Sequence, residues 1–301
     1  MLGSAAWTLR PALLAMVILV RQDRSEGSLR AYTVQELPWV AQRVQAAGIE
    51  AVKLFAADQA GSSGIHGEDP GSVMARAIRI IKRTCPRLQV WTETCLCSHL
   101  PSGECHLSKD GRPDEAGTIA ALSRQAVAQA AAGADVVGPA AMVPGSVEAC
   151  RRALCAAGLG HVGVMPHLIM CSGLYSGYRA TMGITPPAES RRFQLPVGGH
   201  TAAAVERGLL MLAEGANALL IEPALFSADI LAGLRARTDA PLVAFSVSGE
   251  CAALPPAILA EEYTMLLRAG ASRVASHAAL TVADTLSDRP SHRPTTGKPS
   301  P

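Results

Sequence analysis

The sequence predicts an α/β protein built as a single parallel eight-stranded (β/α)8 TIM barrel. Three observations predict it: short apolar runs recur eight times, a segment with helical spacing follows each run, and similar turns lead from helix to strand. Strands that are buried on both faces form continuous apolar runs, and strands that alternate with helices form right-handed parallel units. Eight such units are typical of a closed barrel.

The predicted elements follow one another regularly along the chain. The strands are expected at 13–20, 49–55, 88–95, 134–141, 162–169, 218–225, 241–248 and 272–279. Two intervening segments, 118–132 and 202–213, are Ala-rich and end at or near a glycine, as helices commonly do. A Gly-Ala pair leads into a strand at three places, and this repeated turn supports the barrel register: 133–135, 215–217 and 270–272.

Length and composition favour one domain with a large core. The chain has 301 residues, 49% hydrophobic and 17% charged, with a formal net charge of +2. Such a balance creates no large field for nucleic acid or a membrane surface, so we expect neither as a partner. The apolar segment 11–20 is too short to span a bilayer, and no small-residue cleavage site follows it. We therefore expect a buried first strand and a cytoplasmic protein.

The ends of the chain differ in composition from its centre. Residues 13–285 are assigned to the barrel, and residues 1–12 precede it as a short amino-terminal arm. Residues 286–301 contain four prolines and almost no apolar side chain, so we expect a disordered tail. Residues 57–72 are Gly-rich and polar after a strand, which predicts a loop at the carboxyl end of the barrel, where such enzymes place their sites.

Three cysteines form the strongest local motif. Cys95, Cys97 and Cys105 have the spacing C-x-C-x7-C in one loop after a predicted strand. Thiolates at this spacing suit Zn2+, and three protein ligands leave a fourth position for water or substrate, as in catalytic sites. Two alternatives stay open: a closed site completed by His99 or His106, and three thiols without metal.

The same segment resembles a known family. Residues 91–97, together with Gly103, Glu104 and Cys105, resemble the zinc loop of the porphobilinogen synthase family, also called 5-aminolevulinate dehydratase. The resemblance covers roughly residues 13–285 in the same order, and its further segments are 125–135, 175–179, 191–196, 222–225 and 247–250. It implies the barrel fold, a zinc site and a reaction that joins two 5-aminolevulinate molecules with loss of two waters.

Both lysines that the family uses to form Schiff bases with its substrates are replaced in this chain. Glu222 stands in place of one lysine, and Ile169 or Met170 stands in place of the other. None of these side chains can form an imine, and covalent catalysis on a carbonyl requires an amine. The family mechanism therefore cannot operate unchanged.

Other departures from the family agree with a changed site. Residues 140–145 lack the hydroxyl and the two carboxylates that the family carries there. Glu93 replaces an aspartate, and His277-Ala278 replaces a tyrosine pair. The amino-terminal arm by which the family forms octamers is shortened, so we expect a homo-oligomer smaller than an octamer.

Several substrate-binding groups of the family are retained. Arg179 and Arg191 match arginines on the lid over the site, and a guanidinium fork suits a carboxylate. A solvated lid surface is the alternative for Arg191. The resemblance also implies substrate contacts for Gln194, Ser248, Tyr175 and Phe55. A small substrate with a carboxylate is expected.

Lys53 interrupts an apolar strand, where an unpaired ammonium would be costly to bury. Alternation places it on the same face as Phe55, about 7 Å deeper in the barrel, from a rise of roughly 3.3 Å per residue. We hypothesise a buried pair between Lys53 and Glu222. It could be a structural ion pair, or Lys53 could have a lowered pKa and act as a nucleophile or base. Outward-facing or otherwise unpaired placement is the third alternative.

Three functions remain open from the sequence. The first is a zinc-dependent lyase, dehydratase or condensing enzyme for a small amino-keto or carboxylic acid, with Glu222 as general acid or base. The second is a non-catalytic homologue that binds a ligand or an active synthase. The third, placed last, is porphobilinogen synthesis by a modified route.

Overall fold

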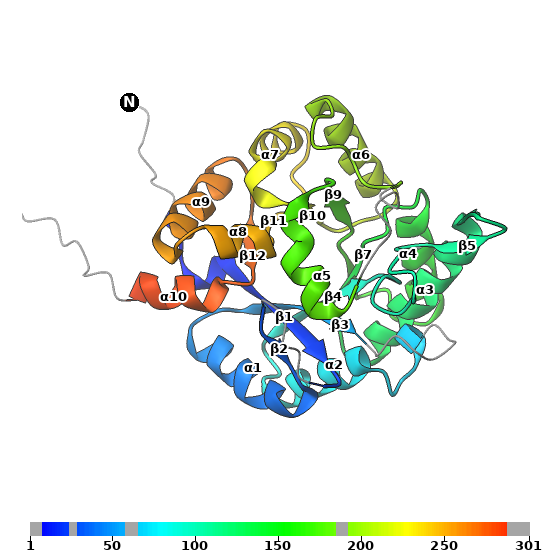
Figure 1. Cartoon of the computed structure of the whole chain (residues 1–301), viewed down its shortest axis with the longest axis horizontal. Helices are drawn as coiled ribbons and strands as arrows, with labels where there is room; N and C mark the ends of the chain where they lie inside the picture. Colours follow the sequence, from blue (N-terminus) through cyan, green and yellow to red (C-terminus); the bar gives the residue numbers. More distant parts are fainter. Residues whose placement is uncertain (1–7, 24–28, 58–65, 185–191, 288–301) are drawn as a thin grey trace, which may run out of the picture.

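The computed structural model describes residues 8–23, 29–57, 66–184 and 192–287, and Figure 1 shows strands surrounded by helices. The strands are β1 Leu14–Arg21, β2 Ala31–Tyr32, β3 Ala51–Ala57, β4 Gln89–Thr94, β5 Leu107–Lys109, β6 Arg112–Asp114, β7 Val136–Pro139, β8 Gly163–Val164, β9 His167–Ile169, β10 Leu219–Glu222, β11 Leu242–Ser246 and β12 Arg273–Ser276. The α-helices are α1 Leu37–Ala46, α2 Val73–Thr84, α3 Glu115–Ala131, α4 Ser146–Ala156, α5 Ser176–Met182, α6 Thr201–Ala213, α7 Ala228–Arg235, α8 Ser248–Ala253, α9 Pro256–Arg268 and α10 Ala279–Ser287. Short 3-10 helices are η1 Pro11–Leu13, η2 Val34–Glu36, η3 His66–Glu68, η4 Gly173–Tyr175 and η5 Ala224–Phe226.

The sheet closes through a strand that is split in two. Its hydrogen-bonded order is β8, β7, β4, β3, β1, β12, β11, β10, β9, with parallel pairing throughout. The two ends of this order, β8 and β9, are separated in the chain only by Met165 and Pro166. Proline has no N–H for the ladder, which explains the interruption. Met165 N donates to Val137 O on one side, and Leu220 N donates to Pro166 O on the other. The predicted (β/α)8 barrel is confirmed.

The eight predicted strands are observed within a few residues of their expected bounds. The two Ala-rich segments form α3 and α6, and the glycines that follow helices adopt positive φ, 108° at Gly133 and 101° at Gly215. The tail was expected from residue 286, but α10 continues through Ser287. Residues 288–301, most of the predicted arm (1–7) and the centre of the predicted loop (58–65) lie outside the described residues.

The barrel interior combines an apolar wall with a few buried polar side chains. Every residue of β3, β10 and β11 is buried, and most of them are apolar. Inside the ring, Lys53 and His167 are at most 1% exposed. Because burying such groups is unfavourable without partners, their contacts define the site described below.

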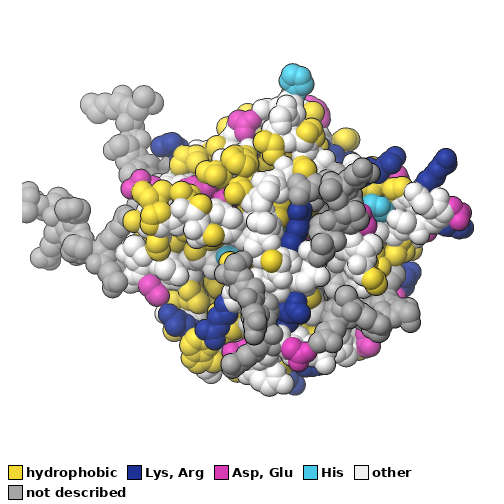
Figure 2. Space-filling model, in the orientation of Figure 1, with side chains coloured by type: hydrophobic (Ala, Val, Ile, Leu, Met, Phe, Trp, Pro, Cys, Tyr) yellow, Lys and Arg dark blue, Asp and Glu magenta, His cyan; other side chains and the backbone are white. Residues whose placement is uncertain are grey.

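The outer surface shows no single dominant feature in the view of Figure 2. On the described part of this face, acidic, basic and apolar side chains are interspersed. Within the described ranges, no helix is both long enough and apolar enough to cross a membrane.

Candidate active site

One cavity opens at the carboxyl ends of the strands and collects most of the predicted site residues. Its walls carry three kinds of groups: the thiols of Cys95, Cys97 and Cys105, a set of acids and histidines, and aromatic and polar groups from the η4–α5 region. The acids and histidines are Glu93, Glu104, His167, Glu222 and His277. This location is where barrels of this type place catalytic groups.

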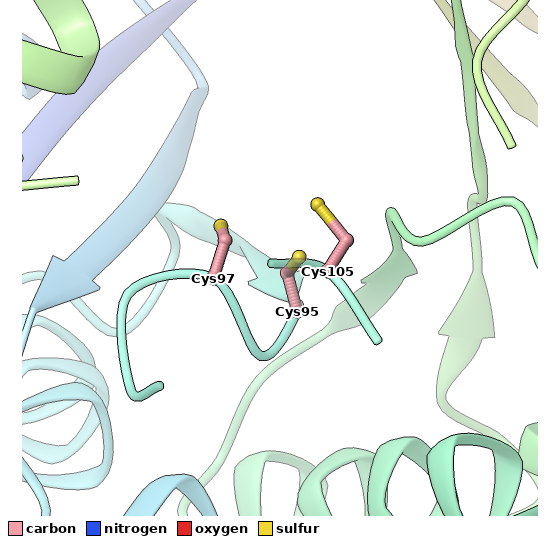
Figure 3. A group of neighbouring side chains, drawn as sticks. All are labelled: Cys95, Cys97 and Cys105. Carbon is pink, nitrogen blue, oxygen red and sulfur yellow. The ribbon is translucent and has the colours of Figure 1, made fainter. Parts of the chain in front are cut away.

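The thiols come from the loop that follows β4. Their sulfur atoms lie within 4.8 Å of one another, and Figure 3 shows the three side chains gathered around one space. Two glutamines of α3 hold the start of this loop: Gln125 Nε2 donates to Cys95 O at 3.1 Å, and Gln129 Nε2 donates to Glu93 O at 2.8 Å. The helix therefore fixes the backbone from which the first thiols project.

The donor set fits a divalent cation. Hydrogen bonds from the other two thiols lower the pKa of Cys105 well below its usual value, while the pKa values of Cys95 and Cys97 are raised well above theirs, chiefly by their interactions with Cys105. Of the three thiols, Cys105 is therefore the one that loses its proton most readily. A bound cation would stabilise all three thiolates, which are the form that ligates zinc.

The two histidines near the thiols, His99 and His106, lie outside the cluster of metal-competent side chains. Neither His99 nor His106 belongs to the described metal-ligating group. His106 instead lies 3.7 Å from Glu104 and packs its ring against Phe193. The three thiols also line the cavity, so a cation held by them would face its interior.

Lys53 lies inside the barrel, as expected, but the direct pair with Glu222 is not formed. Lys53 Nζ donates to Thr92 O at 2.8 Å, and the side chain is fully buried. Burial lowers the pKa of Lys53 to about 7, while Glu93 and Glu222 act to raise it. Lys53 is absent from the described cavity wall, so its amine sits behind that wall. A carbonyl oxygen of the adjacent strand satisfies the ammonium in place of a carboxylate.

Glu222 faces the cavity and pairs with a histidine that the sequence analysis did not single out. His167 Nδ1 lies 2.7 Å from Glu222 Oε1, and these two residues occupy neighbouring strands β9 and β10. Burial raises the pKa of Glu222 to about 8 and lowers the pKa of His167 well below its usual value. His167 is a polar residue in a predicted apolar strand, the same signal that identified Lys53.

The η4–α5 segment supplies one wall of the cavity. Tyr175, Tyr178 and Arg179 all line it, and Tyr178 OH donates to Glu93 Oε2 at 3.3 Å. Tyr175 OH donates to Met170 O at 3.2 Å, which ties the segment to the end of β9. Ser248 is not in the described wall; its hydroxyl donates to Leu174 O and accepts from Tyr178 N. Ser248 thus holds the segment in place.

Two of the remaining predicted site residues line the cavity, and the third lies outside the described residues. Phe55 lines the cavity and stacks edge-on with Tyr178 at 5.3 Å between ring centroids. Gln194 also lines it, and its Oε1 is buried without a hydrogen-bond partner in the described part of the chain. A buried amide oxygen without a partner indicates room for a donor from a ligand. Arg191 lies outside the described residues.

Comparison with known proteins identifies the relatives. The family model described as Delta-aminolevulinic acid dehydratase matches residues 23–285. The Delta-aminolevulinic acid dehydratase of Escherichia coli (strain K12) is 34% identical over 262 residues, which cover 81% of this chain and 78% of that protein. The protein of the same name from Methanothermobacter thermautotrophicus is 34% identical over 270 residues, covering 85% and 81%.

A solved structure supports the fold independently. The crystal structure of delta-aminolevulinic acid dehydratase (porphobilinogen synthase) from Toxoplasma gondii, in complex with the reaction product porphobilinogen, superposes with a TM-score of 0.89 at 21% identity. The match covers 99% of this chain and 91% of that one. Fold and site define a parallel (β/α)8 barrel with a thiol-lined cavity at its carboxyl end. The chain belongs to the Delta-aminolevulinic acid dehydratase family.

Proposed function

We propose that this protein is a zinc-dependent lyase or condensing enzyme that acts on a small amino-keto or carboxylic acid in the cytoplasm. The observation that carries the proposal is that one cavity joins three metal-competent thiols to a buried acid, Glu222, at the position where the family has an amine. Metal ligands and an acid in one enclosed site are the components of a dehydration reaction.

The proposed roles follow from the groups on the cavity wall. Cys95, Cys97 and Cys105 would hold Zn2+, which supplies Lewis-acid activation of a carbonyl or hydroxyl oxygen. With a pKa of about 8, Glu222 holds a proton at neutral pH and can donate it to a leaving oxygen as a general acid.

Substrate binding is assigned to the opposite wall. The Arg179 guanidinium would bind a substrate carboxylate, and Gln194 Oε1 would accept a hydrogen bond from an amine or hydroxyl. Phe55 and Phe245 pack at 5.7 Å between ring centroids and reduce access of water to the reacting groups. The expected substrate is therefore small and anionic, with a polar group near the acid.

The test uses zinc-replete protein and 5-aminolevulinate as the first substrate, followed by related amino-keto and hydroxy acids, with products analysed by mass spectrometry. Glu222→Gln should lower kcat by about 10²-fold or more, the usual scale for loss of an acid–base group, without loss of zinc. Glu206→Gln, a surface change on α6, serves as the matched control. Turnover unchanged in Glu222→Gln would contradict the proposal.

Porphobilinogen formation itself is the second candidate. Relatives of this chain from several organisms bear the name Delta-aminolevulinic acid dehydratase. Their names favour this activity, which the motifs of the sequence alone placed last. The reaction would need a new source of imine chemistry, and Lys53 is the buried lysine next to the site. Borohydride reduction in the presence of 5-aminolevulinate should then leave an adduct on Lys53. Product without an adduct would indicate a route that uses no imine.

A non-catalytic homologue is the remaining alternative. It would bind the same small acids without turnover, or would associate with an active synthase. Absence of product with every substrate, together with calorimetric binding of 5-aminolevulinate, would favour this alternative over both enzymatic proposals.

A further inference from the structure

Three titratable side chains lie one after another in space across the barrel interior, from β3 to β10. Lys53 is on β3, His167 is on β9 and Glu222 is on β10, and none is more than 5% exposed. Glu222, at one end of this series, lines the cavity, whereas Lys53, at the other end, does not. A buried lysine and a buried acid with a histidine between them form an arrangement that apolar packing alone would not require.

The contacts define how the three groups are connected. Glu222 Oε1 and His167 Nδ1 are 2.7 Å apart, so a proton lies between them. His167 Nε2 has no hydrogen-bond partner among the described residues. Its other side faces the position that a Cβ of Gly138 would take, 3.1 Å from Nε2 and 2.5 Å from Lys53 Nζ. The absence of a side chain at Gly138 lets the two nitrogens approach the same space.

We propose that Lys53, His167 and Glu222 form a buried proton relay, in which His167 transfers a proton between Lys53 and the acid that faces the substrate. The proposal rests on the proposed function for the catalytic use of Glu222, but the relay itself requires no substrate. His167 is a positioning residue, because it acts through Glu222.

The relay conserves protons. In one state Lys53 is an ammonium, His167 carries its proton on Nδ1 and Glu222 is a carboxylate. In the other state Lys53 is a neutral amine, His167 carries its proton on Nε2 and Glu222 is a carboxylic acid. To pass between them, Lys53 Nζ, which donates to Thr92 O in this structure, turns into the space beside Gly138 and gives one proton to Nε2, while Nδ1 gives one to Glu222. A neutral imidazole has one donor and one acceptor nitrogen, so its tautomer reports the state of the acid.

Burial and the neighbouring charges shift the pKa values of Lys53 and Glu222 toward each other. Burial brings the pKa values of Lys53 and Glu222 together, to about 7 and about 8, and His167 stays neutral because burial and the Lys53 charge both lower its pKa. The other titratable groups that face the series are Glu93, Cys95, Tyr175 and Tyr178. After release of its proton to substrate, Glu222 could be recharged from Lys53 without access to bulk water.

The experiment measures the His167 tautomer by 15N NMR in zinc-replete protein, without substrate, between pH 6 and pH 9.5. We expect Nδ1 to change from an unprotonated to a protonated nitrogen as Glu222 loses its proton, and we expect no change in Glu222→Gln. His167→Asn assigns the signal. His277, which lines the same cavity and whose Nε2 lacks a partner in the described structure, is the internal control and should keep one tautomer.

A variant of the lysine tests the far end of the relay. Lys53→Met removes a charge that lowers the pKa of Glu222, so the midpoint of the His167 change should move to higher pH. An unchanged midpoint would exclude Lys53. A tautomer that is the same at pH 6 and pH 9.5, or that still changes in Glu222→Gln, would overturn the relay while leaving the proposed lyase activity intact.

If turnover is found, kinetics add a separate readout. His167→Asn retains an acceptor oxygen near Nδ1 but cannot transfer a proton, so kcat should fall by about 10²-fold with little change in KM. Full kcat in His167→Asn would contradict a role in catalysis. Absence of turnover in the wild-type protein would count against the proposed function, whereas the NMR result would still decide the relay.

Discussion

Single residues decide which polar groups can meet inside this barrel, and Gly138 is the clearest case. A Cβ there would lie 2.5 Å from Lys53 Nζ and 2.7 Å from the backbone oxygen of Thr92. Both distances are shorter than real Cβ contacts, and the Thr92 oxygen belongs to the rigid strand β4. Glycine at this position is therefore required by the buried ammonium and its carbonyl partner.

Gly138→Ala should consequently destabilise the protein. We expect the free energy of unfolding to fall by about 1–3 kcal/mol, the usual cost of overpacking an interior site. Urea unfolding followed by circular dichroism gives the measurement. Gly198→Ala is the control, because a Cβ there meets nothing within 4 Å. Equal stability of the two variants would show that Lys53 can relocate at little cost.

At the scale of elements, α8 and α9 each contribute one buried acid. The two carboxylates carry like charges when ionised and therefore repel each other. Glu250 is fully buried on α8, and Glu262 on α9 is 8% exposed. Burial raises the pKa of Glu250 to about 8, helped by Glu262, and burial raises the pKa of Glu262 to about 7. The folded protein thus binds protons here more tightly than the unfolded chain.

This pair makes stability depend on pH. Because both folded pKa values are raised from 4.5, the contribution is complete below about pH 4.5 and is lost as pH rises toward 8. Glu262→Gln should reduce the loss between pH 6 and pH 8.5 by about 1 kcal/mol, an amount limited by solvent screening of Glu262. Urea unfolding at both pH values measures it. Glu261→Gln, an exposed neighbour on α9, should behave as wild type.

The loop after β4 is the element that we expect to bind metal. Zinc titration with a colorimetric chelator should give one ion per chain, and Cys97→Ala should abolish tight binding because two thiols remain. Cys150→Ala is the matched control, since Cys150 is buried on α4 away from the cluster. Equal zinc content in the two variants would contradict the assignment of the site.

Much of the element order could be predicted because buried parallel strands leave a local signature. The split of the fifth strand was missed, although Pro166 lies within the predicted range 162–169 and cannot donate to the ladder. The thiol cluster was predicted because its members are close in sequence. The His167–Glu222 contact was not, because it joins residues 55 positions apart through strand register.

At the scale of the whole molecule, apolar side chains remain exposed on the outer helices. Trp39 on α1 is 50% exposed, Leu210 on α6 is 55% exposed and Ile258 on α9 is 44% exposed. Isolated exposed apolar residues are common, so they do not by themselves define an interface. They are candidate contacts for the homo-oligomer expected from the sequence.

Light scattering coupled to size exclusion should give a mass of more than one and fewer than eight 31.2 kDa chains. Association of two or more chains would cover exposed apolar side chains such as Trp39 and Leu210. The mass should be unchanged by moderate dilution if the interface is stable. A mass of eight chains would contradict the expectation, and so would a monomer at all concentrations.

The closeness of Cys95, Cys97 and Cys105 also makes the protein sensitive to oxidants. Sulfur atoms within 4.8 Å of one another, with the pKa of Cys105 lowered by its neighbours, are suited to form a disulfide whenever no cation occupies them. Such a bond would remove two donors at once, so the chain could not be reloaded with metal until a reductant restored the thiols. Cation supply and the thiol–disulfide balance of the cell would then jointly control what the cavity can do.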